Sequence, residues 1–369
     1  MRNEEIFVTK PFLPPLQEFL PYLESIWASQ KLTNGGRFHQ ELEGALSQYL
    51  RVPYVSLFTN ASIAIVTALK ALDIRGEVIT TPFSFVATTN AIAWNGLTPV
   101  FVDIDPKTLN IDPMAIAEAA SPKTSAILAV HCYGQPCDVV GIRQVAARLG
   151  IPVIYDGAHC FGVADSLGSV LRHGDLSVVS FHATKVFNTF EGGAIVSPTA
   201  EMKQRVDYLR NFGFVDETHV GSVGINGKMN EVSAAMGLLQ LKYVDHILEA
   251  RSEIDSMYRE LLSNVDGLEC LDFDSSIKRN FAYFPVLVKS GFPLSRDSLY
   301  EKLRGERIFA RRYFYPLISN FPMYRDLPSA KECLLPNANS AAGQILCLPI
   351  YPGLSRENVF KIAEIIKST

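Results

Sequence analysis

The sequence predicts an α/β protein in which a mostly parallel sheet is flanked by helices and followed by a smaller α+β domain. First, short runs rich in β-branched residues alternate with helix-periodic stretches between residues 55 and 200, as in parallel sheets. Second, most of these runs are apolar at consecutive positions, which is expected of strands covered by helices on both faces. Third, 369 residues exceed what one hydrophobic core usually accommodates, so two domains are expected.

Each expected element is visible as a segment of the sequence. The strands are expected at Glu77–Phe83, Thr98–Asp105, Thr124–Gly134, Ile151–His159, Leu176–Lys185 and Gly193–Ser197. Helix-periodic stretches lie between several of them, at Ala61–Leu72, Val86–Trp94 and Val139–Leu149.

The second half of the chain begins with a long helix-periodic stretch, Met229–Leu262, which suits a helix that links two domains or lies at a subunit interface. We place the domain boundary here, with a large domain at 1–245, N-terminal arm included, and a small domain at 246–369. The small domain is expected to contain a strand at Asn280–Val288, a helix at Ser295–Leu303 and a final amphipathic helix at Glu357–Lys367.

Composition and charge exclude several classes of function. A net charge of -4 provides no general basic surface for nucleic acid. The N-terminus MRNEEIFVTKPFLPP is acidic where a signal peptide is basic, and no run reaches about 18 apolar residues, so a cytoplasmic protein without a membrane segment is expected. The cysteines and histidines lack the spacing of a metal site, and no P-loop or dinucleotide-binding glycine motif is present.

Polar residues follow the apolar runs at the positions where parallel strands would end. Asp156 ends the run IPVIYD and is followed by His159, and Lys185 ends the run LSVVSFHATK. A Gly192-Gly193 pair then allows close backbone approach. Ligands of open α/β sheets bind beyond the carboxyl ends of the strands. Taken alone, the aspartate is more often a cap and the lysine more often solvated, but the ordered combination is much rarer than either.

This arrangement suits an enzyme that holds pyridoxal 5′-phosphate. A lysine forms a Schiff base when desolvation or nearby positive charge lowers the pKa of its amine. The cofactor withdraws electrons while its ring nitrogen is protonated, and a buried carboxylate such as Asp156 keeps the proton there. The segment Asn60-Ala61-Ser62 opens a helix directly after the run YVSLF, where backbone amides suit a phosphate.

The chain resembles the DegT/DnrJ/EryC1/StrS family of sugar aminotransferases over nearly its full length. The segments that carry the resemblance are IFVTKPFLPPL, VITTPFSFVATT, HCYGQPCDV, SFHATKVFNTFEGGAIV and GINGKMNE. The resemblance implies the type I fold of aspartate aminotransferase, pyridoxal 5′-phosphate as cofactor, and L-glutamate and a keto-sugar nucleotide as substrates. Within the family the chain is similar to members that form dTDP-4-amino-4,6-dideoxy-D-glucose for surface polysaccharides such as the O-antigen of lipopolysaccharide.

The resemblance also implies roles for individual residues of the cofactor ring site. Lys185 is expected to carry the cofactor and to move the proton, and Asp156 to pair with the ring nitrogen. His159 lies where many relatives have a glutamine that contacts the phenolic oxygen, and Phe85 matches the aromatic residue stacked on the ring.

The phosphate positions implied by the resemblance are Ala61, Ser62 and Ser180. Ala61 stands where glycine is more usual, so it would contribute through its backbone N–H alone. Asn226 is expected to reach the phosphate from the partner subunit, with Lys228 as a possible second contributor, so that a homodimer shares its active sites.

Alternatives remain open at the level of the sequence. Phe85 is also compatible with the hydrophobic core, and His159 with a buried structural role. His131 and Tyr133 are either packing residues or substrate contacts. The stretch ARRYFYPL, residues 310–317, suits a diphosphate site and a solvated surface equally. The rival functions are a 3-keto-sugar aminotransferase, a sugar dehydratase, in which histidine replaces the lysine, and a non-catalytic regulatory protein.

Overall fold

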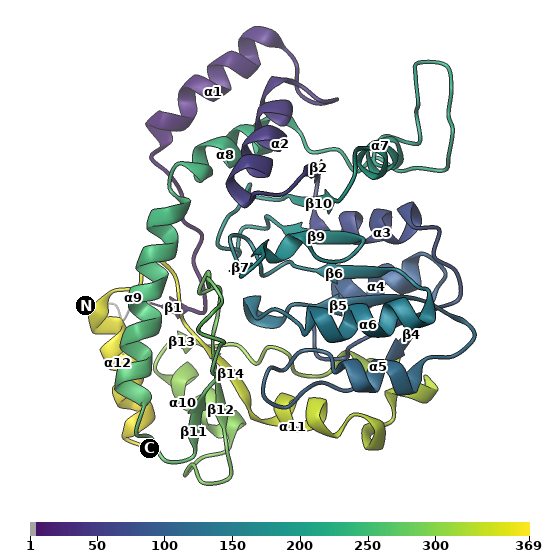
Figure 1. The fold of residues 1–369 in the computed structure, drawn as a ribbon. Helices are drawn as coiled ribbons and strands as arrows, with labels where there is room; N and C mark the ends of the chain where they lie inside the picture. Colours follow the sequence, from purple (N-terminus) through teal and green to yellow (C-terminus); the bar gives the residue numbers. More distant parts are fainter. Residues whose placement is uncertain (1–4) are drawn as a thin grey trace.

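The fold is built around a seven-stranded sheet, and the computed structural model describes residues 5–369 (Figure 1). The strand order is β2-β10-β9-β6-β5-β3-β4. Only β10 runs antiparallel to its neighbours in this sheet of the described chain. The strands are β2 (Tyr54–Phe58), β3 (Glu77–Thr80), β4 (Thr98–Phe101), β5 (Thr124–Val130), β6 (Val153–Asp156), β9 (Leu176–Ser180) and β10 (Gly193–Ser197).

Helices cover both faces of the sheet, as the apolar strands predict. In β5, Ala126 and Leu128 belong to the core formed with α3, α4 and α7, whereas Ile127 and Ala129 belong to the core formed with α5 and α6. A third core joins α1, α2 and α8 to the β2 side of the sheet. These helices are α1 (Leu16–Ser29), α2 (Arg37–Leu50), α3 (Ala61–Ala71), α4 (Val86–Trp94), α5 (Pro113–Ala119), α6 (Val139–Leu149), α7 (Ala200–Leu209) and α8 (Glu231–Leu241).

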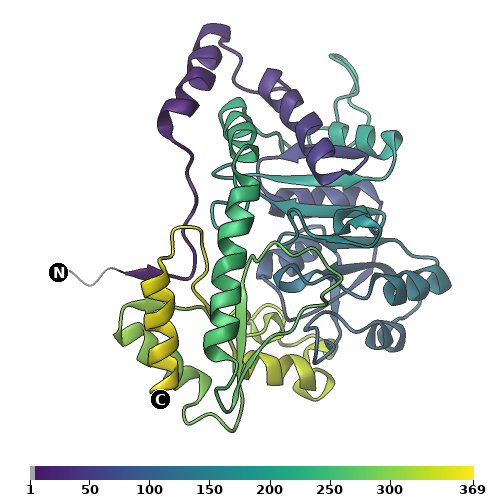
Figure 2. The same cartoon turned by 60° about the vertical axis from the view of Figure 1, so that its left-hand side comes forward.

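A smaller α+β layer follows. Its antiparallel sheet has the order β11-β12-β14, and α9 and α12 lie side by side against it (Figures 1 and 2). The elements of this part are α9 (Val244–Leu262), β11 (Leu268–Cys270), β12 (Phe284–Val288), α10 (Arg296–Gly305), β13 (Ile308–Phe309), α11 (Pro336–Gln344), β14 (Ile345–Leu348) and α12 (Arg356–Lys367). Shorter elements are β1 (Ile6–Phe7), β7 (Ala164–Asp165) and β8 (Gly168–Ser169).

Several expected element bounds need correction. The strands expected to end at Phe83, Asp105, Gly134 and His159 end three or four residues earlier, at Thr80, Phe101, Val130 and Asp156. The single helix expected at Met229–Leu262 is two helices, because the backbone N–H groups of Lys242 and Tyr243 bond three residues back and tighten the chain between α8 and α9. The strand expected at Leu176–Lys185 ends at Ser180, where pairing with Gly193 of β10 stops. The five residues after Ser180 form a loop, and that loop carries Lys185.

The predicted domain boundary falls in the first turn of α9 and stays a prediction. Ile6 packs in the core of the second layer, with β1 paired to β13, so the N-terminal arm contacts both parts of the molecule. In residues 5–369 no helix is both long enough and apolar enough to cross a bilayer.

Candidate active site

A cavity of about 370 Å³ lies where β6 and β9 end and α3 begins, and the smaller layer closes its other side. This volume is within the roughly 300–1,000 Å³ typical of small-molecule sites. The cavity contains the predicted residues Ala61, Ser62, Phe85, Asp156, His159, Ser180 and Lys185 in its wall. The other wall residues that matter below are Asn60, Ser84, His182, Glu191, Tyr283, Arg311, Tyr313 and Phe314.

Lys185 is held in the loop after β9. Its backbone N–H donates to the carbonyl of His182 (2.9 Å), and its partly buried side chain places Nζ 3.4 Å from the Tyr283 hydroxyl. Burial lowers the pKa of the Lys185 amine, although the charges of Asp156 and Tyr313 act in the opposite direction. The amine is therefore more readily neutral, and so more nucleophilic, than a solvated lysine.

Asp156 ends β6 and is buried, with 5% of its surface exposed. The hydroxyl of Thr88 in α4 donates to Oδ2 (2.7 Å), and the backbone N–H of Ala158 donates to Oδ1 (3.0 Å). Burial nevertheless raises the pKa of the carboxyl, and the two hydrogen bonds and the Lys185 charge offset only part of that rise. A cation placed beside Asp156 would keep the carboxylate ionised.

His159 is buried beside Lys185. The backbone N–H of Tyr133 donates to Nδ1 (3.2 Å), and the Tyr283 hydroxyl lies 3.3 Å from Nε2. Burial, followed by the nearby Lys185 charge, lowers the pKa of His159 well below 6.5. His159 is thus a neutral imidazole that is hydrogen-bonded and also lines the cavity, so the two interpretations of this residue are not exclusive.

The beginning of α3 is a ready anion site. Asn60 caps the helix by accepting from the N–H of Ile63 (2.9 Å), and the N–H groups of Ala61 and Ser62 have no backbone or side-chain acceptor in the described chain. Gly193 packs closely against this turn, since a Cβ built on Gly193 would lie 2.6 Å from the Ala61 nitrogen. Helix N-termini bind phosphate through such free amides.

Ser180 and Phe85 complete this part of the wall. Ser180 ends β9, is buried, and accepts from the N–H of His182 (3.3 Å). Phe85 precedes α4 and is 59% exposed at the cavity, so the interpretation of Phe85 as a core residue is wrong. An exposed ring at this position is free to stack on a planar ligand.

Asn226 does not line the cavity of its own chain. Asn226 is exposed and forms an isolated antiparallel β-bridge with Asn211. The Lys228 amine donates to the Asn211 side chain (2.6 Å). Both lie at the base of the hairpin between α7 and α8, which extends from the body of the molecule (Figure 1). A role for Asn226 or Lys228 in a partner's site stays a prediction.

The remaining sequence candidates separate into two groups. His131 and Tyr133 are packing residues outside the cavity wall, since His131 stacks on Tyr155 (4.5 Å) and Tyr133 packs against Phe314 (5.9 Å). In the stretch 310–317, the cavity is lined by Arg311, Tyr313 and Phe314. Arg312 instead pairs with Asp297 (2.7 Å) outside it.

Sequence reasoning missed Thr88, which holds Asp156, and Tyr283, which contacts Lys185. Thr88 is one of several polar residues in a helix and carries no signal of its own. Tyr283 lay inside the expected strand Asn280–Val288, yet β12 begins at the next residue, Phe284, and leaves Tyr283 at the strand entrance.

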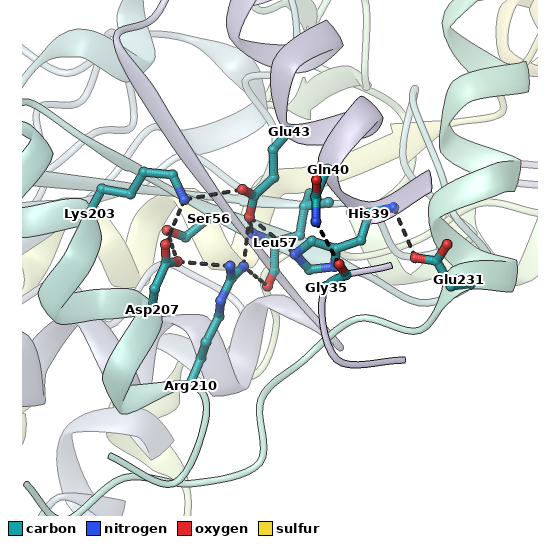
Figure 3. Close-up of polar contacts among 10 residues, drawn as sticks. All are labelled: Gly35, His39, Gln40, Glu43, Ser56, Leu57, Lys203, Asp207, Arg210 and Glu231. Atoms are coloured by element: carbon teal, nitrogen blue, oxygen red, sulfur yellow. Dashed lines mark hydrogen bonds and ion pairs between the residues drawn. The ribbon is translucent and has the colours of Figure 1, made fainter. Parts of the chain in front are cut away.

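A cluster of ion pairs binds the backbone near the end of β2, next to the turn into α3 (Figure 3). Glu43 of α2 accepts from the N–H of Leu57 (3.1 Å), from Arg210 (2.8 Å) and from Lys203 (3.1 Å). Arg210 also donates to the carbonyl of Leu57 (2.6 Å), two residues before Thr59. Burial alone would raise the pKa of Glu43, but the bond from His39 and the two cations bring it well below 4.5. Glu43 is therefore a charged anchor for the end of β2.

In residues 5–369 no group of three histidine, cysteine, aspartate or glutamate side chains is arranged to hold a metal ion. The groups of the cavity that can carry chemistry include Lys185, Asp156 and the anion site at α3, and these fit pyridoxal 5′-phosphate. The free amides suit its phosphate, the buried carboxylate its ring nitrogen, and the amine its aldehyde.

Comparisons with known proteins agree with this geometry. A dTDP-4-amino-4,6-dideoxy-D-glucose transaminase of Shigella dysenteriae is 54% identical over 367 residues, covering 100% of this chain and 98% of that protein. A protein of the same name from Escherichia coli is 52% identical, with 99% of each chain covered. The crystal structure of DesI in the presence of its TDP-sugar product has a TM-score of 0.94 at 33% identity, covering 99% of this chain and 92% of that one.

The structural likeness confirms the predicted fold class, the type I fold of pyridoxal-phosphate sugar aminotransferases. The model described as the DegT/DnrJ/EryC1/StrS aminotransferase family matches residues 16–367, which is nearly the whole chain. The chain therefore belongs to the DegT/DnrJ/EryC1/StrS aminotransferase family.

Proposed function

We propose that this aminotransferase moves the amino group of L-glutamate to dTDP-4-keto-6-deoxy-D-glucose, giving dTDP-4-amino-4,6-dideoxy-D-glucose, with pyridoxal 5′-phosphate as cofactor. The observation that carries the proposal is the presence of Lys185, Asp156 and the free α3 amides in one cavity. Two relatives above 50% identity bear the name of this activity, which supports the choice of sugar. Lys185 argues against the dehydratase alternative. The transaminase name of the two relatives above 50% identity argues against the regulatory alternative.

The chain's own residues hold the cofactor in this proposal. The N–H groups of Ala61 and Ser62, with the Ser180 hydroxyl, bind the phosphate, and Phe85 covers one face of the ring. Asp156, held by Thr88, pairs with the ring nitrogen. Once bound, pyridoxal 5′-phosphate draws electron density from the substrate carbon that carries the amine.

Lys185 moves the proton in both halves of the reaction. Over the two halves glutamate would be converted to 2-oxoglutarate and the keto carbon of the sugar would receive its amine, with the bound cofactor supplying the carrier for that amine. In each half, the Lys185 amine takes a proton from one carbon and returns it to another. Its lowered pKa suits this task, because a base must be neutral to accept a proton. Arg311 lines the same cavity and supplies a fixed positive charge for an anionic substrate.

A direct assay tests the activity. The purified holoenzyme should show an absorbance band near the visible edge that shifts when glutamate is added. Glutamate alone should give at most one equivalent of 2-oxoglutarate per site, and continuous formation of 2-oxoglutarate should require the keto-sugar. A panel of 4-keto and 3-keto nucleotide sugars identifies the acceptor, and preference for a 3-keto sugar would reject the 4-keto assignment. Lys185→Ala should abolish both the shift and turnover, and retained turnover would refute the assignment of Lys185.

The active enzyme in this proposal is a homodimer in which Asn226 reaches the cofactor phosphate of the partner subunit. The hairpin that carries Asn226 exposes apolar side chains, among them Phe214, Val220 and Val223, as expected of a surface covered in an assembly. Mixing Lys185→Ala and Asn226→Ala subunits tests this. Random exchange should restore about one quarter of wild-type activity, because half the dimers regain one complete site. Mixtures as inactive as their components would reject the shared site.

We further propose that the enzyme works in the cytoplasm and that its product enters a surface polysaccharide such as the O-antigen of lipopolysaccharide. The names of the two relatives support the product. Deleting the gene should remove the 4-amino sugar from surface glycan hydrolysates, and an unchanged sugar composition would contradict the role.

A further inference from the structure

Tyr283 places a hydroxyl between the two basic side chains of the cavity. Its oxygen lies 3.4 Å from Nζ of Lys185 and 3.3 Å from Nε2 of His159. Its ring meets the imidazole of His159 edge to face, with centroids 4.7 Å apart. These distances are long for hydrogen bonds, but such contacts in ligand-free sites often tighten during the reaction.

The segment before Tyr283 is fixed to the loop that carries His159. The Asn280 amide donates to the carbonyls of His159 (2.7 Å) and Phe161 (2.9 Å), and Asn280 accepts from the N–H of Ala282 (3.1 Å). Asn280 is 2% exposed, so water does not compete for these bonds. The position of Tyr283 relative to His159 is therefore set by side chain-to-backbone bonds and does not depend on a flexible loop.

A buried arginine fixes the same segment from the other side. Nη1 of Arg251 in α9 donates to the carbonyls of Phe281 (3.2 Å), Ala282 (3.3 Å) and Ile350 (3.1 Å). Arg251 is 2% exposed, so water does not compete for these three bonds. Two independent anchors on the segment 280–283 therefore fix the backbone from which the Tyr283 side chain reaches Lys185.

The hydrogen-bond directions follow from the tautomer of His159. Because the N–H of Tyr133 donates to Nδ1, the hydrogen of the neutral imidazole is on Nε2, and that N–H donates to the Tyr283 oxygen. The hydroxyl hydrogen of Tyr283 is then free to point at Lys185. Burial raises the pKa of Tyr283 and lowers the pKa of Lys185, so a phenol donor faces an amine with an available lone pair.

We propose that Tyr283 is a catalytic residue whose hydroxyl donates a hydrogen bond to the Lys185 amine whenever that amine is released from the cofactor, holding it neutral and aimed at the cavity. The inference rests on the proposed function, because only an enzyme that detaches Lys185 from its cofactor leaves the amine free.

Other groups also act on the Lys185 amine and must be kept constant. They are Asp156 at the end of β6, His159 in the next loop, Tyr313 after β13 and, around the cavity, His182, Glu191 and Arg311. All of them stay in place when only the hydroxyl of Tyr283 is removed. A change in the titration of Lys185 in Tyr283→Phe therefore reports that hydroxyl.

The test is the rate at which Lys185 captures free cofactor. Hydroxylamine removes the cofactor from the holoenzyme, and pyridoxal 5′-phosphate is then added in a stopped-flow spectrometer over a range of pH. In this step Nζ forms a C=N bond with the aldehyde carbon and one water leaves. In Tyr283→Phe the midpoint of the pH–rate curve should rise by about half a unit to one unit, with capture about three- to tenfold slower below the midpoint, as the loss of one hydrogen bond predicts.

Tyr258→Phe is the matched control. Tyr258 is fully buried in the same layer, its ring lies 4.8 Å from that of Phe284, and its hydroxyl has no hydrogen-bond partner in the described chain. This variant should match the wild-type capture curve. A Tyr283→Phe curve that coincides with the wild-type curve would overturn the inference.

A second substitution keeps the inference testable if Tyr283→Phe does not fold. Incorporating 3-fluorotyrosine at position 283 keeps the ring and makes the hydroxyl a stronger donor, so the midpoint should move down, opposite to the change in Tyr283→Phe. An upward or absent shift contradicts the proposed bond. Wild-type apoenzyme that never captures pyridoxal 5′-phosphate would refute the proposed function itself, and so separates the two failures.

Discussion

Replacing Gly193 by alanine should weaken cofactor binding without removing any polar group of the site. The added Cβ would lie 2.6 Å from the nitrogen and 2.8 Å from the Cα of Ala61, and 2.9 Å from the carbonyl carbon of Asn60. All three are backbone atoms, so no side-chain rotation relieves the contact. Gly193 is itself paired to Phe58 and Ser180, which leaves the start of α3 to move.

The magnitude follows from what must move. Overpacking of this kind costs about 1–3 kcal/mol of stability. Displacing the Ala61 amide removes one hydrogen bond to a charged phosphate, about 1.5–3 kcal/mol, so the Kd for pyridoxal 5′-phosphate should rise roughly 10- to 100-fold. Equilibrium titration of apoenzyme measures the Kd, and thermal unfolding measures the stability.

Gly44→Ala is the control for this prediction. Gly44 lies within α2, and a Cβ built there meets nothing within 4 Å. Alanine should raise stability by about 0.5–1 kcal/mol, because it favours the helix, and should leave the Kd unchanged. If Gly193→Ala binds the cofactor as tightly as wild type, the close packing of β10 against α3 does not shape the phosphate site.

Three further perturbations test other parts of the site. Thr88→Val removes the hydrogen bond from the Thr88 hydroxyl to Asp156, so the pKa of Asp156 should rise further and turnover should fall about tenfold. Thr89→Val is the control: the Thr89 hydroxyl has no partner in the described chain, so activity should not change. Glu43→Gln should destabilise the fold by about 1.5–3 kcal/mol, since it removes a charged acceptor for Arg210 and Lys203, which Asp207 still pairs. Because the folded pKa of Glu43 is depressed, the contribution of Glu43 to wild-type stability should be complete above pH 4.5 and should fade as the pH falls below 4.5 in denaturant titrations. Burial lowers the pKa of His131 to about 3, so the imidazole should stay neutral in NMR titrations from neutral pH down to near pH 3. Stability should fall as the pH drops below 6.5, because the ring takes up a proton in the unfolded chain but not in the folded one. A His131 ring that titrates near 6.5 would contradict its burial.

The position of Asp156 at the end of a strand was predictable because it depends on a local pattern. Ser180 was implied only by the resemblance to the family. Asp156 ends the apolar run IPVIYD, and the carboxyl ends of adjacent parallel strands must meet at one edge of a sheet. Lys185 was found by the same reasoning, although its run was read five residues too long. The error arose because Phe181 is as buried as a strand residue, and hydrophobicity alone does not show where pairing with β10 stops.

Contacts that depend on tertiary structure left no local trace. Thr88 meets Asp156 across 68 positions of the chain, and Tyr283 meets Lys185 across 98. The break between α8 and α9 is similar, because the ring of Tyr243 packs on Phe12, far away in sequence. Periodicity continues through such a break, since both helices still present an apolar face to a core.

The two layers of the molecule contribute differently to the cavity, and this separates cofactor chemistry from substrate choice. The large layer supplies the free amides of α3, Asp156 and Lys185, which are the groups that the proposed function assigns to the cofactor. The smaller layer supplies Tyr283, which contacts Lys185, and also Arg311, Tyr313 and Phe314, which close the opposite wall. Variants of the wall residues Arg311 and Tyr313 should therefore change KM or the preferred sugar while the Kd for the cofactor stays constant. An equal loss of cofactor affinity in Arg311→Ala would show that the two layers do not divide the work in this way.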